Sequence, residues 1–159
     1  MSNKSLAIIA TKGTLDWGYP PFILSSTAAA LGYDVQIFFT FYGLQLLKKD
    51  MKLSVSPLGN PGMPMPMGMD KWFPVIGTAI PGMQNIMTMM MKSKMKNKGV
   101  ASLPELRSLC QEAEVKMIAC QMTVDLFDMS PNDFIDDVEY GGAATFFDFA
   151  GESDICLFI

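Results

Sequence analysis

The sequence contains no histidine. This absence excludes the Ser-His-Asp and Cys-His machinery of common hydrolases, any histidine general base, and the ordinary zinc and non-haem iron sites. Arginine is almost absent as well, because Arg107 is the only one in the chain. A reactive cysteine in this protein would therefore depend on backbone dipoles or on a lysine for its activation.

Positive charge is also scarce. The 12 basic residues are outnumbered by 16 acidic ones, which gives a net charge of -4. The one basic cluster contains no interleaved aromatic residues, so we expect no nucleic-acid partner; it consists of Lys92, Lys94, Lys96 and Lys98. Half of the residues are hydrophobic, and such a composition favours adhesive surfaces and a homo-oligomer.

The three cysteines form no CxxC pair and leave an odd thiol. This pattern argues against a disulfide framework and fits a reducing compartment. Residues 1–5 lead directly into a short apolar strand, without the longer apolar region and cleavage site of a secretory signal. We therefore expect a cytoplasmic protein.

Short apolar runs alternate with helical patterns along the chain. The predicted strands are residues 6–11, 34–40, 115–119, a short one around Val138, and 153–159; the predicted helices are 17–31, 42–49, 103–113, 121–127 and 142–150. This alternation predicts a three-layer α/β/α fold, with a mostly parallel sheet of about five strands in flavodoxin-like topology. We expect one domain over residues 1–159, with Cys110 on the apolar face of its helix and Cys156 in the core.

An insertion rich in methionine and proline interrupts this pattern at about residues 57–99. Ten of the 15 methionines lie between Met63 and Met95, and residues 72–91 carry no formal charge. That length would suit a membrane span, but a span would separate the first two strands from the third. Burial in a subunit interface is the preferred interpretation, and contact with a membrane surface is the alternative.

Two methionine patterns within the insertion have their own interpretations. A helical stripe is more often packing than a cofactor site; it consists of Met83, Met87, Met90 and Met91. Closely spaced thioethers suit Cu(I), so soft-metal handling is a further alternative; they are Met63, Met65, Met67 and Met69.

Cys120 is the candidate reactive residue, because it falls where the third strand gives way to helix 121–127. Free N–H groups at a helix N-terminus favour a thiolate. Lys12, at the end of the first strand, would face the same crevice if the strand order were 2-1-3-4-5, and Thr123 could offer a hydroxyl. The alternatives are a small buried hydrophobic cysteine and a solvated loop lysine.

Several stretches carry a resemblance to a known family: Ala10–Asp16, Phe38–Leu44, Gly62–Met69, Ala119–Leu126 and Gly141–Phe146. The chain resembles the DsrE/DsrF-like family, in the branch labelled DsrE2-type or peroxiredoxin-like. The resemblance implies that Cys120 accepts sulfane sulfur as a persulfide and passes it to a partner. It also implies oligomers and partners such as a TusA-like sulfur carrier and a rhodanese. No cofactor or metal is expected.

Other activities fit the residues less well. Peroxidase chemistry usually places a threonine three residues before the reactive cysteine and an arginine nearby, but Met117 occupies that position. Residues 121–126 supply no cation to hold a thiosulfate anion, unlike a rhodanese loop. A carrier that receives sulfur from another protein fits better, and a non-catalytic oligomeric interaction module is the alternative.

Overall fold

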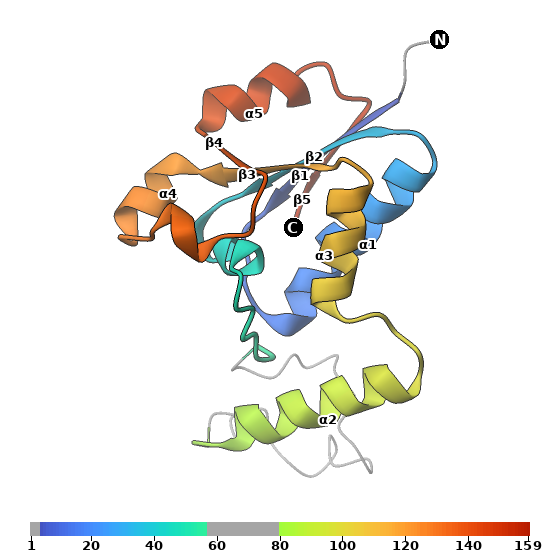
Figure 1. Cartoon of the computed structure of the whole chain (residues 1–159), viewed down its shortest axis with the longest axis vertical. Coiled ribbons are helices and arrows are strands. Elements are labelled where there is room, and N and C mark those ends of the chain that lie inside the picture. The colour runs from blue at the N-terminus through green and yellow to red at the C-terminus, as the bar shows by residue number, and fades with distance from the viewer. Residues whose placement is uncertain (1–3, 57–79) are drawn as a thin grey trace.

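The computed structural model describes residues 4–56 and 80–159, and it contains a five-stranded parallel sheet in the order β4-β3-β2-β1-β5 (Figure 1). The strands are β1 (Ser5–Ala10), β2 (Asp34–Phe39), β3 (Lys116–Cys120), β4 (Val138–Gly141) and β5 (Ile155–Phe158). Helices cover both faces of this sheet. The predicted three-layer α/β/α fold is confirmed.

The helices divide between the two faces of the sheet. Figure 1 shows α1 (Leu15–Ala30) and α3 (Leu103–Glu112) together on one face and α5 (Ala143–Ala150) on the other. The short α4 (Gln121–Leu126) follows β3 directly. Among the described residues, the 3-10 helices η1 (Phe41–Leu47) and η4 (Pro131–Asp133) lie in loops, and α2 (Met83–Asn97) lies beside the body of the protein.

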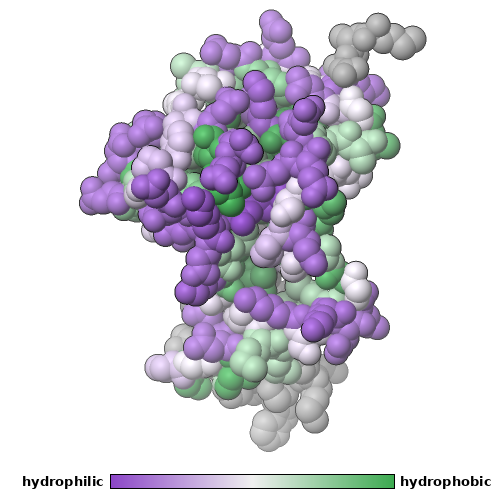
Figure 2. Space-filling view, in the orientation of Figure 1, coloured by the Kyte–Doolittle hydropathy of each residue, from purple (hydrophilic) through white to green (hydrophobic). Residues whose placement is uncertain are grey.

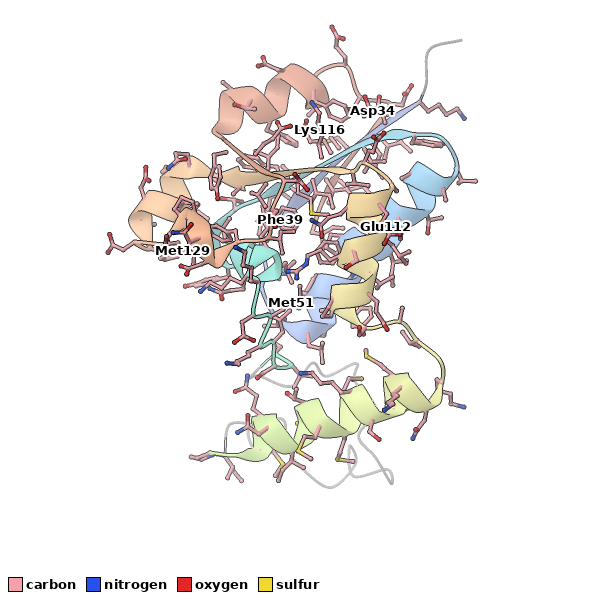
Figure 3. All side chains as sticks on the ribbon, viewed as in Figure 1. Asp34, Phe39, Met51, Glu112, Lys116 and Met129 are labelled. Atoms are coloured by element: carbon pink, nitrogen blue, oxygen red, sulfur yellow. The ribbon has the colours of Figure 1, made fainter. Side chains whose placement is uncertain are left out.

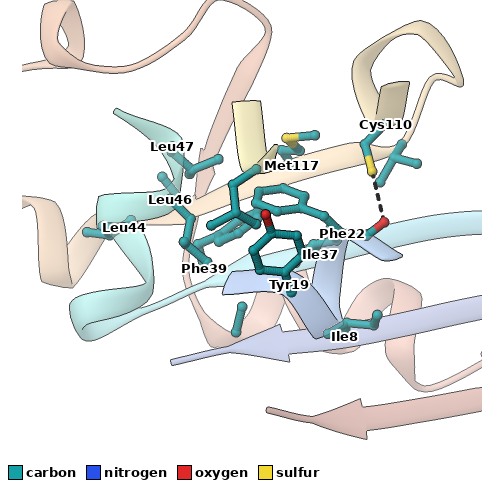
Figure 4. Packing of buried hydrophobic residues seen from close by; sticks show 14 of the residues in the cluster. Ile8, Tyr19, Phe22, Ile37, Phe39, Leu44, Leu46, Leu47, Cys110 and Met117 are labelled. Atoms are coloured by element: carbon teal, nitrogen blue, oxygen red, sulfur yellow. Dashed lines mark hydrogen bonds between the residues drawn. The ribbon is translucent and has the colours of Figure 1, made fainter. Parts of the chain in front are cut away.

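Side chains of each strand alternate between two hydrophobic cores of unequal size, as expected for a sheet covered on both faces. The larger core lies under α1 and α3, and it includes Phe22 and Phe39 (Figure 4). The smaller core lies under α5 and consists of Ala7, Phe38, Ile118, Cys120 and Phe146. Cys120 therefore belongs to the less extensively covered face.

The assumed strand order, in which the first and third strands are neighbours, is wrong. β2 lies between them and pairs with both, Ala10 opposite Phe39 and Phe39 opposite Ala119. The two crossovers from β1 to β3 step across the sheet in the same direction, and the connection through α5 returns to the far side of β1. Hydrophobic periodicity locates the strands along the sequence, but it does not show on which side of the previous strand each new strand pairs.

The prediction that Cys156 lies in the core is also wrong, because its side chain is exposed. It lies on β5, an edge strand with β1 as its neighbour in the sheet. Cys156 pairs with Ala7 and Phe158 with Ile9, so both face the side that α5 covers. Phe158 is 75% exposed at the end of this strand.

The helix α2 contacts the body through one face. The Val55 N–H donates to the Thr88 hydroxyl, and the Gln84 side chain donates to the Val55 carbonyl. Met87 and Met91 of the predicted stripe pack against the larger core, whereas Met90 is exposed. The four methionines proposed as copper ligands lie outside the described residues.

Within residues 4–56 and 80–159, no helix combines the length and apolar character needed to cross a membrane.

Candidate functional site

Cys120 is the last residue of β3 and the N-cap of α4, as the sequence predicted. Its backbone is extended, with φ -65° and ψ 110°, so the chain turns into the helix directly after the cysteine. The side chain points into the small core under α5, and only 5% of the residue is exposed. The sulfur is thus recessed at the carboxyl edge of the sheet.

Two effects act on the Cys120 thiol in opposite directions. Burial is the largest single effect and would raise the pKa of Cys120. Hydrogen bonds from the Thr123 and Thr40 hydroxyls and from the backbone of Thr123 and Met122 outweigh it, so the pKa lies below its ordinary value. The site therefore stabilises a thiolate in a nearly buried position, which is the ionisation state that a nucleophilic sulfur needs.

The two threonines form a connected network. Their hydroxyl oxygens lie 3.2 Å apart, and the Phe41 N–H donates to the Thr123 hydroxyl oxygen at 3.3 Å. Because this N–H occupies a lone pair of Thr123, the hydroxyl proton of Thr123 is free to point toward the sulfur or toward Thr40. The network thus fixes hydrogen-bond donors beside Cys120 before any substrate arrives.

Close packing of η1 on the end of β1 places Thr40 in the site. A Cβ on Gly43 would lie 2.1 Å from the Ala10 carbonyl oxygen, so only glycine permits this approach. The Gly43 N–H donates to the carbonyls of Thr11 and Thr40, and Phe41 has a positive φ of 48°. Sequence reasoning identified Thr123 but missed Thr40, because its role depends on β2 being the neighbour of β3.

Lys12 does not join this network. Its amine lies 3.1 Å from the centroid of the Trp17 ring, a cation–π contact between the loop after β1 and the first turn of α1. Since β2 separates β1 from β3, the two strands lie about 10 Å apart across the sheet. The geometric argument for Lys12 as the activator of Cys120 is therefore removed, and the groups that lower the pKa of Cys120 are hydroxyls and backbone N–H groups.

Cys110 and Arg107 of α3 lie in the larger core, away from this site. The Cys110 thiol donates to the Phe22 carbonyl at 3.5 Å (Figure 4), and burial raises the pKa of Cys110 to about 12. The Arg107 guanidinium is buried and donates to the carbonyls of Leu46 and Lys48. Arg107 therefore secures the end of η1, and the arginine that peroxidase chemistry would require is not at Cys120.

Over the part of the chain that the structure describes, no three His, Cys, Asp or Glu side chains come close enough together to hold a metal ion.

Comparisons with known proteins place the chain in a family. The profile of the DsrE/DsrF/DrsH-like family matches residues 2–158. The chain is 79% identical over 159 residues to "Sulfur carrier protein DsrE2" of Allochromatium vinosum, with all of both chains covered. It is 33% identical to "Uncharacterized protein YrkE" of Bacillus subtilis, covering 98% of this chain and 97% of that one.

A solved structure shows the same fold. The crystal structure of the ychN protein from E. coli superposes with a TM-score of 0.57, covering 98% of this chain and 99% of that chain. The two sequences are 11% identical, so this likeness concerns the fold alone.

Proposed function

The chain belongs to the DsrE/DsrF/DrsH-like family, and we propose that it is a sulfur carrier that holds sulfane sulfur as a persulfide on Cys120. The 79% identical relative bears the name of a sulfur carrier protein, which supports the general role. The observation that carries the assignment to Cys120 is the set of hydrogen-bond donors that lowers the pKa of this buried thiol. We propose that it works in the cytoplasm, where thiols stay reduced.

Loading begins with attack of the Cys120 thiolate on the outer sulfur of a donor persulfide, R–S–SH. A bond forms between Cys120 Sγ and that sulfur, the donor S–S bond breaks, and the donor leaves as a thiolate. The products are Cys120–S–SH and R–S⁻, so sulfur moves without any external oxidant or reductant. No histidine base is needed, because the nucleophile is already ionised.

Unloading reverses the roles. An acceptor thiolate attacks the outer sulfur of Cys120–S–SH, and Cys120 leaves as a thiolate. A thiol of lower pKa is the better leaving group. The hydrogen bonds from Thr40 and Thr123 thus assist both steps, since they stabilise the thiolate that begins loading and the one that ends unloading.

The test is the intact mass of the reduced protein after incubation with inorganic polysulfide. Wild type should gain about 32 Da per sulfur atom, and a thiol reductant should remove the gain. Cys120→Ser should lose the uptake, whereas Cys110→Ala and Cys156→Ser serve as matched controls that retain it. Uptake by Cys120→Ser at the wild-type level would refute the assignment.

A sulfur carrier requires a donor and an acceptor, and we propose a rhodanese as donor and a TusA-like sulfur carrier as acceptor. We also propose a homo-oligomer. The support is the exposed hydrophobic side of α2, formed by Ile86, Met89 and Met90, of which Met89 is 72% exposed. Figure 2 shows hydrophobic and hydrophilic groups side by side over α2.

The same surface of α2 also supports the alternative of membrane-surface contact, because lysines adjoin its methionines (Lys92, Lys94, Lys96). Sedimentation in detergent-free buffer and flotation with anionic vesicles separate the two proposals. Met89→Glu and Met90→Glu together should split an oligomer. Met87 is unsuitable for this test, since it packs against the protein's own core. A stable monomer of wild type that floats with vesicles would favour the membrane.

A further inference from the structure

Exposed hydrophobic side chains gather on the surface next to Cys120. They are Phe41 and Tyr42 at the start of η1 and Met122, Leu126 and Phe127 on and just after α4. The Phe127 ring stacks on Tyr42 at 5.9 Å between centroids and meets Phe41 edge-on at 6.5 Å. Since six helical residues span about 9 Å, this whole group lies within roughly one helix length of Cys120.

Carboxylates outnumber basic groups on α4 and the segments that follow it. Asp125 and Asp128 lie on and just after α4, and Asp133 lies on η4. Asp125 accepts a hydrogen bond from the Gln121 side chain. Lys48 and Lys49 follow η1 directly, and Lys49 pairs with Asp136 at 3.8 Å. Lys12, on the loop after β1, is held over Trp17. Figure 2 shows a largely hydrophilic surface over α4.

Sulfur transfer requires an acceptor to reach Cys120, whose residue is only 5% exposed. An acceptor thiol that approaches the outer sulfur from the carboxyl edge of the sheet would contact the start of η1 and α4 beside it. We propose that these residues form a docking site for an acceptor protein whose reactive cysteine lies among basic and apolar side chains. This proposal rests on the proposed function and specifies the chemistry of its partner.

Charge complementarity favours this occupant over an acidic one. An acidic surface attracts a basic partner at long range and accelerates encounter, while the aromatic side chains supply apolar contact area. The transfer is balanced: Cys120–S–SH and R–S⁻ give Cys120–S⁻ and R–S–SH, with one S–S bond broken and one formed. A second copy of this chain, presenting the lysines of α2, would offer similar chemistry and is distinguished by the test.

The probes are two short cysteine peptides, Ac-KLCLK-amide and Ac-ELCLE-amide. Wild type is loaded with inorganic polysulfide, and loss of the persulfide to each peptide is followed by intact mass in 20 mM and 500 mM salt. Rates are divided by each peptide's rate with glutathione persulfide, which corrects for the different reactivity of the two peptide thiols. The basic peptide should react about tenfold faster at low salt, with little difference at high salt.

Matched variants locate the effect. Asp125→Asn with Asp128→Asn should remove most of the preference for the basic peptide. Asp34→Asn with Glu112→Gln removes the same charge far from α4, as Figure 3 shows, and should retain it. Phe127→Ala should slow transfer to the leucine peptides more than to a serine-flanked peptide. The alkylation pH profile of each variant separates docking from changes in the Cys120 thiol itself.

Three results would overturn the docking site: equal normalised rates for the two peptides, a preference that survives 500 mM salt, or equal losses in the two charge-neutralised variants. Self-association of wild type that Asp125→Asn with Asp128→Asn abolishes would assign the surface to a second copy instead. Failure of the proposed function looks different, because Cys120 would then not load at all, before any peptide is added.

Discussion

Cys110 and Cys120 occupy the two opposite faces of one sheet, and both residues are nearly inaccessible, at 0% and 5% exposure. If burial were the only effect, it would raise the pKa of both thiols. It does so at Cys110, to about 12, whereas the pKa of Cys120 lies below its ordinary value. The degree of burial therefore does not determine the direction in which each pKa moves.

The number of hydrogen-bond donors around each sulfur does distinguish the two thiols. Cys110 donates to the Phe22 carbonyl, an acceptor that favours the protonated thiol, and the single backbone donor beside it, at Ser26, does not offset burial. Cys120 faces the hydroxyls of Thr40 and Thr123 and backbone N–H groups, which are donors that favour the thiolate. A strand end that leads into a helix supplies such donors, whereas the centre of a helix, with its N–H groups already paired, supplies few.

The largest expected effect is the difference in thiol labelling. At pH 7.5, methyl methanethiosulfonate should modify Cys120 at least about 1,000-fold faster than Cys110, because the reactive thiolate fraction falls tenfold for each unit of pKa. Peptide mapping by mass spectrometry in a Cys156→Ser background measures both rates. Labelling of Cys110 at a rate similar to that of Cys120 in the folded protein would contradict the proposed difference between the two thiols.

The next effect is on stability at alkaline pH. The unfolded chain releases the Cys110 proton near pH 9, but the folded chain retains it to about pH 12. The free energy of unfolding therefore falls with rising pH in this window, by up to about 1.4 kcal/mol per pH unit, and is unaffected by this thiol below it. Urea unfolding of wild type and Cys110→Ala at pH 9.0 and 10.5 should show their difference changing by about 2 kcal/mol.

Cys120 acts on stability with the opposite sign. Its pKa is lowered on folding, so its contribution is present above about pH 9 and is lost as the pH falls through the lowered pKa. The difference in the free energy of unfolding between wild type and Cys120→Ala should therefore increase as the pH rises from acid to alkaline values. If the free energy of unfolding depended on pH in the same way in both alanine variants, the two thiols would have the same environment, contrary to this prediction.

A smaller effect is expected from single hydroxyls. Thr123→Val and Thr40→Val keep the side-chain shape and should each raise the pKa of Cys120. Thr123→Val should be the more effective, because the Thr123 hydroxyl lowers this pKa more than the Thr40 hydroxyl does. Each should cost about 1 kcal/mol of stability. Thr11→Val is the matched control, since its hydroxyl donates to the Ile159 carbonyl. An unchanged alkylation profile in both site variants would contradict the donor explanation.

The sequence alone predicted the elements of this fold and the junction at Cys120, because these depend on local patterns. Apolar runs located β1, β2 and β3. The helix predicted at residues 103–113 is α3, and it begins at a capping box formed by Ser102 and Glu105. Thr123 was identified because it is three residues from Cys120 in the same helix.

Features that depend on how strands are arranged were not predictable in this way. Thr40 reaches Cys120 only because β2 is the neighbour of β3, and Cys156 is exposed only because β5 lies at an edge. Both follow from the direction of each crossover, which is decided by packing across the whole sheet. The expectation that Lys12 faces Cys120 rested on the same assumed strand order.

The smallest expected effect is that of Lys12→Met, which should leave the alkylation pH profile of Cys120 unchanged. The Lys12 amine contacts the Trp17 ring, and the groups that lower the pKa of Cys120 are neutral donors. The variant should instead lose the cation–π contact, at a cost of about 0.5–1 kcal/mol in urea unfolding. A profile displaced to higher pH would restore lysine activation, and the contrast between the two cysteines would then rest partly on charge. An unchanged profile would identify the hydroxyl and backbone donors as the cause of the lowered pKa of Cys120. Such a thiolate has no ion pair with a cation, so no ion pair has to break when its sulfur attacks a donor.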